Sequence, residues 1–99
     1  MKILITDYAK EELRLIYEYY SIKASIKVAS KIKKDIISAI KNIAVNPLMF
    51  QIEDDLTELG KQHRRKVDGN YKIIYRIENE IIYVTDIFDA RRNPDNMNG

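Results

Sequence analysis

Basic side chains gather around the most strand-like part of this 99-residue chain. Residues 61–76 carry a single acid, Asp68, and six basic groups: Lys61, Arg64, Arg65, Lys66, Lys72 and Arg76. A further basic pair, Arg91–Arg92, follows the last apolar run. Guanidinium groups match phosphate and carboxylate oxygens bidentately and keep their charge at neutral pH. The pattern therefore indicates an anion-binding surface. The simpler interpretation of the same pattern is a solvated strand face.

One side chain, His63, has an ordinary pKa near neutrality and is the candidate for proton transfer. The simpler interpretation of a lone histidine at the start of a strand is a surface residue. The acidic run 53–58 (EDDLTE) places Glu53, Asp54 and Asp55 side by side. A metal site would need a second group of carboxylates or histidines beside them, so we expect solvated loop charges and neither a metal nor a cofactor.

The composition is typical of an ordinary globular protein with one core, at 45% hydrophobic and 32% charged residues. No apolar run approaches the roughly 20 residues that span a bilayer, so no membrane association is expected. The opening MKILIT is too short for the core of a signal peptide. Cysteine is absent, which excludes disulfides and makes the cytoplasm the expected location.

Two helices are predicted to position these groups. Apolar residues recur at steps of three and four within 8–21, after a capping Thr6 or Asp7. Residues 24–45 form a longer amphipathic pattern that ends at Asn46–Pro47. Its expected inner face comprises Val28, Ala29, Ile32, Ile36, Ala39, Ile40 and Ile43. The opposite stripe of lysines is most simply a solvated face, and nucleic-acid contact is the alternative.

Strands are expected at 2–5, 63–67, 71–77 and 81–88, with a loop over 47–60. In 71–77, alternation turns Tyr71, Ile73, Tyr75 and Ile77 toward the helices and Lys72, Ile74 and Arg76 toward an exposed outer face. The neighbouring strand adds either His63 and Arg65 or Arg64 and Lys66 to that face, depending on register. The order β-α-α-β-β-β predicts one α+β domain over 1–99, a helical hairpin packed on an antiparallel sheet, with a frayed tail at 93–99.

A helical hairpin ending in a proline precedes a strand pair that reads R-x-V-x-G-x-Y-[KR]-I-x-Y-R-I, and the last strand leads into an arginine-bearing tail. In these features the chain resembles the RelE/ParE superfamily, the toxins of bacterial type II toxin–antitoxin pairs. The resemblance covers nearly the whole chain. The matching residues are Pro47, Leu59, Gly60, Arg65, Val67, Gly69, Tyr71, Lys72, Ile73, Tyr75, Arg76, Ile77, Ile87, Phe88, Arg91, Arg92 and Pro94.

The resemblance implies a cognate antitoxin, encoded nearby, and one of two targets. RelE-like members cleave mRNA on the ribosome, and for that branch the matching catalytic set is His63, Arg65, Lys72 and Arg92. Attack by a ribose 2′-hydroxyl needs a proton acceptor, a proton donor and cations for the charge that builds on phosphorus. Arg64, Lys66, Arg76 and Arg91 are then expected to bind the target.

ParE-like members poison DNA gyrase without hydrolytic chemistry, and this is the alternative to mRNA cleavage. Many cleaving members carry a tyrosine or histidine close to the C-terminus, whereas nothing after Arg92 here can take that part. The basic strand residues favour mRNA cleavage, which is the predicted function, and the missing group favours gyrase as the alternative target. An inactive relic that still binds an antitoxin is the third interpretation.

Overall fold

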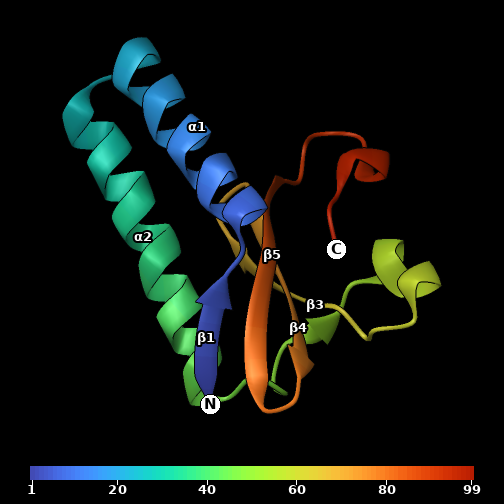
Figure 1. Cartoon of the computed structure of the whole chain (residues 1–99). Helices are drawn as coiled ribbons and strands as arrows, with labels where there is room; N and C mark the ends of the chain where they lie inside the picture. Colours follow the sequence, from blue (N-terminus) through green and yellow to red (C-terminus); the bar gives the residue numbers. More distant parts are fainter.

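A helical hairpin lies along one face of a five-stranded sheet in the computed structural model, which describes residues 1–99 (Figure 1). No helix in it has both the length and the apolar character needed to cross a membrane. The elements in chain order are β1 (Lys2–Ile5), α1 (Asp7–Lys23), α2 (Ile26–Val45), β2 (Gln51–Ile52), the 3-10 helix η1 (Asp54–Leu59), β3 (Arg64–Asp68), β4 (Tyr71–Glu78), β5 (Ile81–Asp89) and the 3-10 helix η2 (Pro94–Asn96).

Both helices begin at hydroxyl caps. The Thr6 side chain accepts from the N–H of Ala9 at 3.2 Å, and Ser25 accepts from Val28 at 3.1 Å, which satisfies free donors of the first turns. The predicted inner face of α2 is confirmed for the buried Ala29, Ile36, Ala39, Ile40 and Ile43. Val28 was wrongly included, because it lies in the first turn and is 41% exposed.

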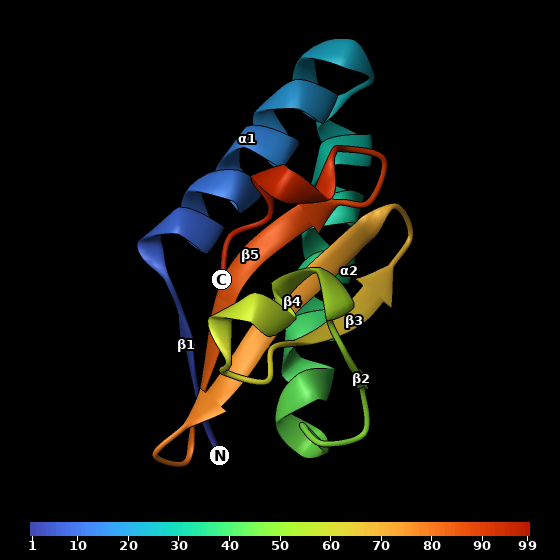
Figure 2. The same ribbon diagram turned by 90° about the vertical axis from the view of Figure 1, so that its right-hand side faces the viewer.

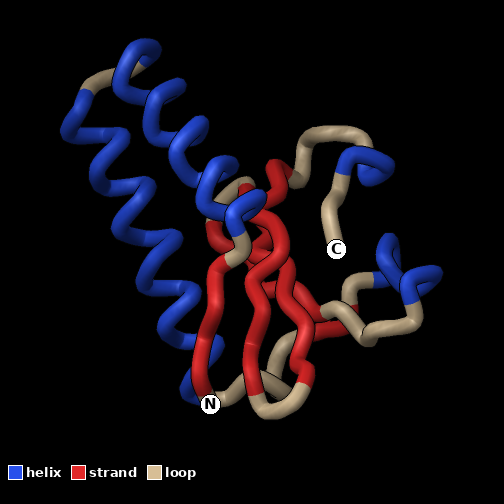
Figure 3. The backbone as a smooth tube through the Cα atoms, viewed as in Figure 1, coloured by secondary structure: helices blue, strands red, loops and turns tan.

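The strand order is β1-β5-β4-β3-β2. The two helices packed beside one sheet confirm the α+β class (Figure 3). The sheet is mixed rather than antiparallel, because β1 pairs parallel with β5. The alternation of apolar and polar residues does not show whether two strands pair parallel or antiparallel when no tight turn joins them. The strand β2 was not predicted, because its two residues are too few to show an alternating pattern.

The main core fills the space between the hairpin and the sheet. Tyr71, Ile73 and Tyr75 of β4 pack there against Ile36 and Ile40 of α2, as the alternation predicts. The Tyr75 hydroxyl also donates to the carbonyl of Pro47, which lies just after the end of α2. This packing fixes the inner face of the sheet and leaves the outer face to the rest of the chain.

The outer face of the sheet is covered, and the expectation that it is exposed was wrong. Ile74 of β4 and Phe88 of β5 are buried there with Leu56 of η1 and Met97 of the C-terminal segment. Figure 2 shows η1 and that segment in front of the strands. The tail predicted to be frayed therefore packs on the sheet, because Met97 buries its apolar side chain there.

Candidate functional site

The register of β3 against β4 decides which basic residues share the outer face. Arg65 lies opposite Ile74 and Arg64 opposite Tyr75, so the alternative with Arg65 outward is the one observed. Arg64 points to the helix side and donates to the carbonyl of Phe50 at 2.6 Å. Lys66 shares that side and places its ammonium 4.5 Å from the centre of the Phe50 ring. Arg64 and Lys66 are thereby separated from the predicted site.

A buried carboxylate, Glu53, holds two of the predicted catalytic cations. Its Oε1 accepts from the Lys72 ammonium at 2.9 Å, and its Oε2 lies 3.8 Å from the Arg65 guanidinium. Oε2 also accepts from the backbone N–H of Asp55 at 3.1 Å. Glu53 is only 1% exposed, so its assignment as a solvated loop charge was wrong. The basic groups of the strands stabilise this carboxylate, which burial alone would make costly.

The guanidinium of Arg65 is almost fully used by its own chain. It donates to the carbonyl of Ile52 at 2.6 Å and to the amide oxygen of Gln51 at 2.8 Å. These bonds fasten β2 to the edge of β3 and orient Arg65 toward Glu53. Little of its donor fork remains for an external anion.

The imidazole of His63 is 1% exposed and does not lie on the surface as a lone histidine is expected to. Its Nε2 lies 3.0 Å from the carbonyl oxygen of Gly99, and since a carbonyl only accepts, Nε2 carries the proton. Its Nδ1 is buried without a partner. Burial lowers the pKa of His63, and Arg76 and Lys61 lower it further, although the bond to Gly99 opposes them. Burial therefore disfavours the charged imidazole and keeps it out of contact with solvent.

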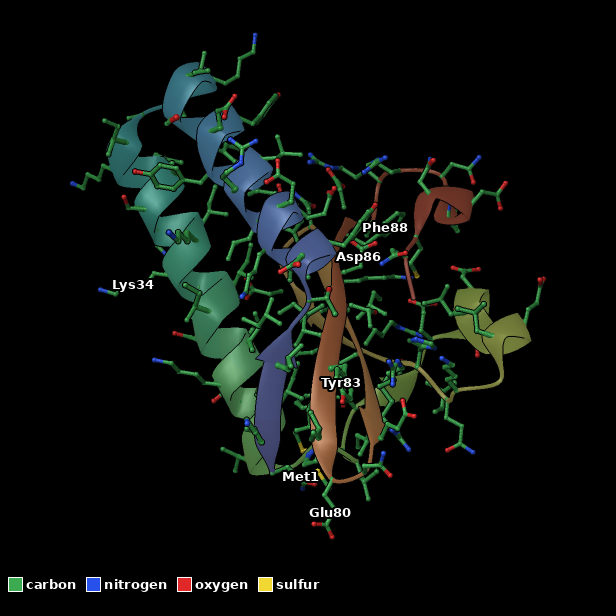
Figure 4. All side chains as sticks on the ribbon, viewed as in Figure 1. Met1, Lys34, Glu80, Tyr83, Asp86 and Phe88 are labelled. Atoms are coloured by element: carbon green, nitrogen blue, oxygen red, sulfur yellow. The ribbon has the colours of Figure 1, made fainter.

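Arg76 is also engaged within the sheet. It pairs with Glu78 on its own strand, and its guanidinium lies 4.5 Å from the ring centre of Tyr83, its neighbour on β5. Figure 4 shows Tyr83 partway along β5, well below Phe88 and Asp86. An arginine stacked on an aromatic ring and paired with a carboxylate has a structural role of its own.

The two arginines after β5 have different surroundings. Arg91 donates through Nε and Nη2 to the carboxylate of Asp89 at 2.9 and 2.7 Å, and these bonds lower the pKa of Asp89. Arg92 forms no ion pair and lies 6.0 Å from the ring centre of Phe88. Among the eight basic and histidine residues predicted for the site, Arg92 is the cation best placed to meet a partner.

A groove of about 760 Å³ runs between α1 and the end of β5, where Arg91 and Arg92 form part of its wall. Leu15 and Tyr19 line it from α1 and are partly exposed. The sequence signal for this surface is a second apolar stripe of α1, to which Leu15 and Tyr19 belong. The remaining lining residues are Glu12, Ile16, Tyr20, Tyr71, Ile87 and Asp89.

The architecture and these residues together match a known family. Residues 3–94 fit the family model described as the ParE toxin of the type II toxin–antitoxin system parDE. The chain belongs to the ParE toxin family. A solved structure of the chromosomal ParDE toxin–antitoxin system from P. aeruginosa has the same fold, with a TM-score of 0.77 and 19% identity over 90% of this chain and 95% of the other. No curated protein sequence matches the chain.

In this ParE-family chain the residues predicted as a catalytic set are divided among three places. Lys72 and Arg65 converge on Glu53, His63 lies beneath the C-terminal segment, and Arg92 lies at the α1 groove. Their catalytic role stays a prediction. The arrangement supplies a structural ion-pair cluster on one side and a partly apolar, arginine-edged groove on the other.

Proposed function

We propose that this ParE-family toxin inhibits growth by binding DNA gyrase and that it breaks no bond in RNA. The observation that carries the proposal is the engagement of Lys72 and Arg65 by the buried carboxylate of Glu53. Cleavage of RNA would need these cations at the scissile phosphate, where their charge would offset that of the transition state. A cation already paired with an internal anion offers that charge only after the pair is broken.

The state of His63 supports the same conclusion. A general base must reach the proton that it abstracts, directly or through one water. His63 is buried, its Nε2 is bonded to the Gly99 carbonyl, and burial lowers its pKa. The one side chain predicted for proton transfer is therefore not accessible to a ribose hydroxyl.

We also propose a cognate antitoxin as the partner that restrains the toxin. The P. aeruginosa relative is described as a toxin–antitoxin system, and the groove along α1 offers apolar contacts edged by arginine. A segment with apolar anchors and carboxylates would complement that groove. Co-expression with the product of an adjacent reading frame is expected to restore growth and to give a complex that resists proteolysis.

The target is tested by two assays on the same preparation. Purified toxin is expected to reduce DNA supercoiling by gyrase in proportion to its concentration, while primer extension on transcripts from induced cells shows no new ends. A His63→Gln variant is the matched control, because it removes the only candidate base and is expected to stay inhibitory in the supercoiling assay. New transcript ends at induction, absent with His63→Gln, would instead establish ribosome-dependent cleavage.

A further inference from the structure

We propose that the lysine stripe along α2 binds the phosphate backbone of duplex DNA. The stripe comprises Lys27, Lys31, Lys34 and Lys41, which lie on the exposed face opposite the buried residues of the helix. Figure 4 shows Lys34 on the side of the molecule away from the sheet, so the stripe is separate from the ion pairs of Glu53. The α1 groove contains no residue of α2. The inference goes beyond the proposed function, because it concerns contact with DNA and not with gyrase.

The charge of the stripe is not neutralised by its own helix. Lys31 pairs with Asp35 at 2.8 Å, and Asp35 is the only acid in α2. Lys27, Lys34 and Lys41 have no carboxylate within ion-pair distance. Three of the four ammonium groups are therefore free to meet an external anion.

The exposed face of α1 shows the arrangement of charges that suits a solvated helix. Arg14 there pairs with Glu11 at 2.6 Å and with Glu18 at 2.7 Å, so opposite charges alternate along the helix. In α2, by contrast, Lys27 and Lys31 are four positions apart, a spacing at which like charges destabilise a helix. Lys27 also lies in the first turn, where the helix dipole disfavours a cation. Such a repulsive arrangement favours a surface that a polyanion covers.

The shape of the stripe matches a straight, rigid polyanion. Lys27, Lys34 and Lys41 recur every seven residues, so an α-helix spaces them about 10.5 Å apart over a length of about 21 Å. Duplex DNA carries one negative charge per roughly 1.7 Å of its axis and is straight on this scale. A single-stranded nucleic acid or a disordered acidic peptide would have to be ordered along the stripe, at a cost in conformational entropy. The stripe therefore favours a duplex.

The residues between the lysines favour DNA over a membrane surface. Ser30, Ser38 and Asn42 are exposed on this face, and all three are polar. A helix that lies on a bilayer inserts an apolar face, whereas the apolar face of α2 is packed against the sheet. The major groove of B-form DNA also admits an α-helix, while that of A-form RNA is too narrow for side chains to read. The occupant is therefore a DNA duplex, held through its phosphates without readout of its sequence.

Neutralising the stripe tests the proposal. The variant Lys27→Gln/Lys34→Gln/Lys41→Gln removes the three unpaired charges, and glutamine has a helix propensity close to that of lysine. The probe is a labelled DNA duplex of about 24 base pairs and mixed sequence, followed by fluorescence anisotropy between about 25 and 200 mM NaCl.

The matched control is Lys2→Gln/Lys10→Gln/Lys61→Gln, which changes the net charge equally at three exposed lysines outside α2. Each phosphate contact contributes about 0.9 to the slope of log K against log[NaCl], because binding releases counterions. The stripe variant should therefore lose about 2.7 from the slope of the original chain and bind on the order of 10²-fold more weakly at low salt. The control should keep the slope to within about one contact.

Several results would overturn the proposal. Equal weakening by the stripe variant and the control would trace binding to net charge alone. An original chain that does not bind the duplex at the lowest salt would have no DNA site. Tighter binding to an RNA duplex of the same sequence, or to vesicles that contain anionic lipid, would assign the stripe to another polyanion.

Circular dichroism checks that both triple variants fold. If the stripe variant does not, Lys34→Gln against Lys10→Gln decides the question through a slope change of about 0.9. The binding assay contains no gyrase, so failure of the DNA site and failure of the proposed target are distinguishable.

Discussion

The carboxylate of Asp86 accepts a hydrogen bond from the backbone N–H of Asn98 at 2.9 Å and so ties the C-terminal segment to β5. Asn98 adds two bonds to Thr85, one through its side-chain amide and one through its carbonyl. Figure 4 places Asp86 and Phe88 at the end of β5 near this segment. The buried carboxylate of Asp86 therefore helps to hold the C-terminal segment against the outer face of the sheet.

The Asp86→Asn variant tests this attachment through pH. Burial raises the pKa of Asp86 to about 6 from its ordinary 3.8, with Glu12 adding to the rise, while the bond from Asn98 and the charge of Arg92 oppose it. Since the folded-state pKa is the higher one, Asp86 contributes stability at low pH that is lost as the pH rises toward about 6. The variant lacks this loss, because its amide does not ionise.

Chemical denaturation of both proteins from pH 3.5 to 7.5 measures the effect. The stability of Asp86→Asn relative to the original chain should increase by about 2 kcal/mol between pH 4 and 6 and stay constant above. A difference independent of pH would mean that Asp86 ionises normally when folded.

Core truncation should separate the packed face of α2 from its exposed end. Ile36 is fully buried against β4, so Ile36→Ala should lower the free energy of unfolding by about 2–5 kcal/mol. Val45 ends the same helix and is 83% exposed, so Val45→Ala should change it by less than about 0.5 kcal/mol. Urea denaturation compares the two variants, and similar losses would argue against this orientation of α2.

Truncation of Lys72 should destabilise the protein, although a lysine on an exposed face would not. Lys72→Ala leaves the buried Glu53 carboxylate without its closest cation. We expect a loss of about 1–3 kcal/mol, since Arg65 and the Asp55 N–H still stabilise the carboxylate. The double variant Lys72→Ala/Glu53→Gln should recover part of the loss in thermal denaturation. An unchanged melting temperature for Lys72→Ala would show that the pair is not formed in solution.

Toxicity should depend more on Arg92 than on Arg91. Arg92 has no ion-pair partner at the groove, whereas Arg91 is bonded to Asp89 by its side chain and its backbone N–H. Arg92→Ala should abolish growth inhibition at matched soluble expression, and Arg92→Lys should restore part of it, since an ammonium lacks the planar fork. Arg91→Ala is the matched control, because it removes the same charge from a side chain that is already paired with Asp89. Full toxicity of Arg92→Ala would remove this arginine from the interaction surface.

The sequence by itself determined the features that depend on local period. The apolar spacing of 8–21 and 24–45 predicted α1 and α2 to within about two residues, because a helix repeats its inner face every three or four positions. Alternation placed Tyr71, Ile73 and Tyr75 in the core for the same kind of reason. The same stretch carried the motif by which the family was suspected, and the family model confirmed it.

Only the tertiary structure decided which charges face one another. Glu53 and Lys72 are 19 positions apart, and their contact depends on a two-residue strand and a 3-10 helix too short to leave a period in the sequence. The sequence alone did not decide which face of the sheet Arg65 occupies, because a register shift of one residue moves every side chain of the strand to the other face. Ile74 is likewise buried only because Leu56 and Met97, from two segments distant in the sequence, pack against it. Alternation gives a side chain its face of the sheet, but packing between distant segments decides whether that face meets water.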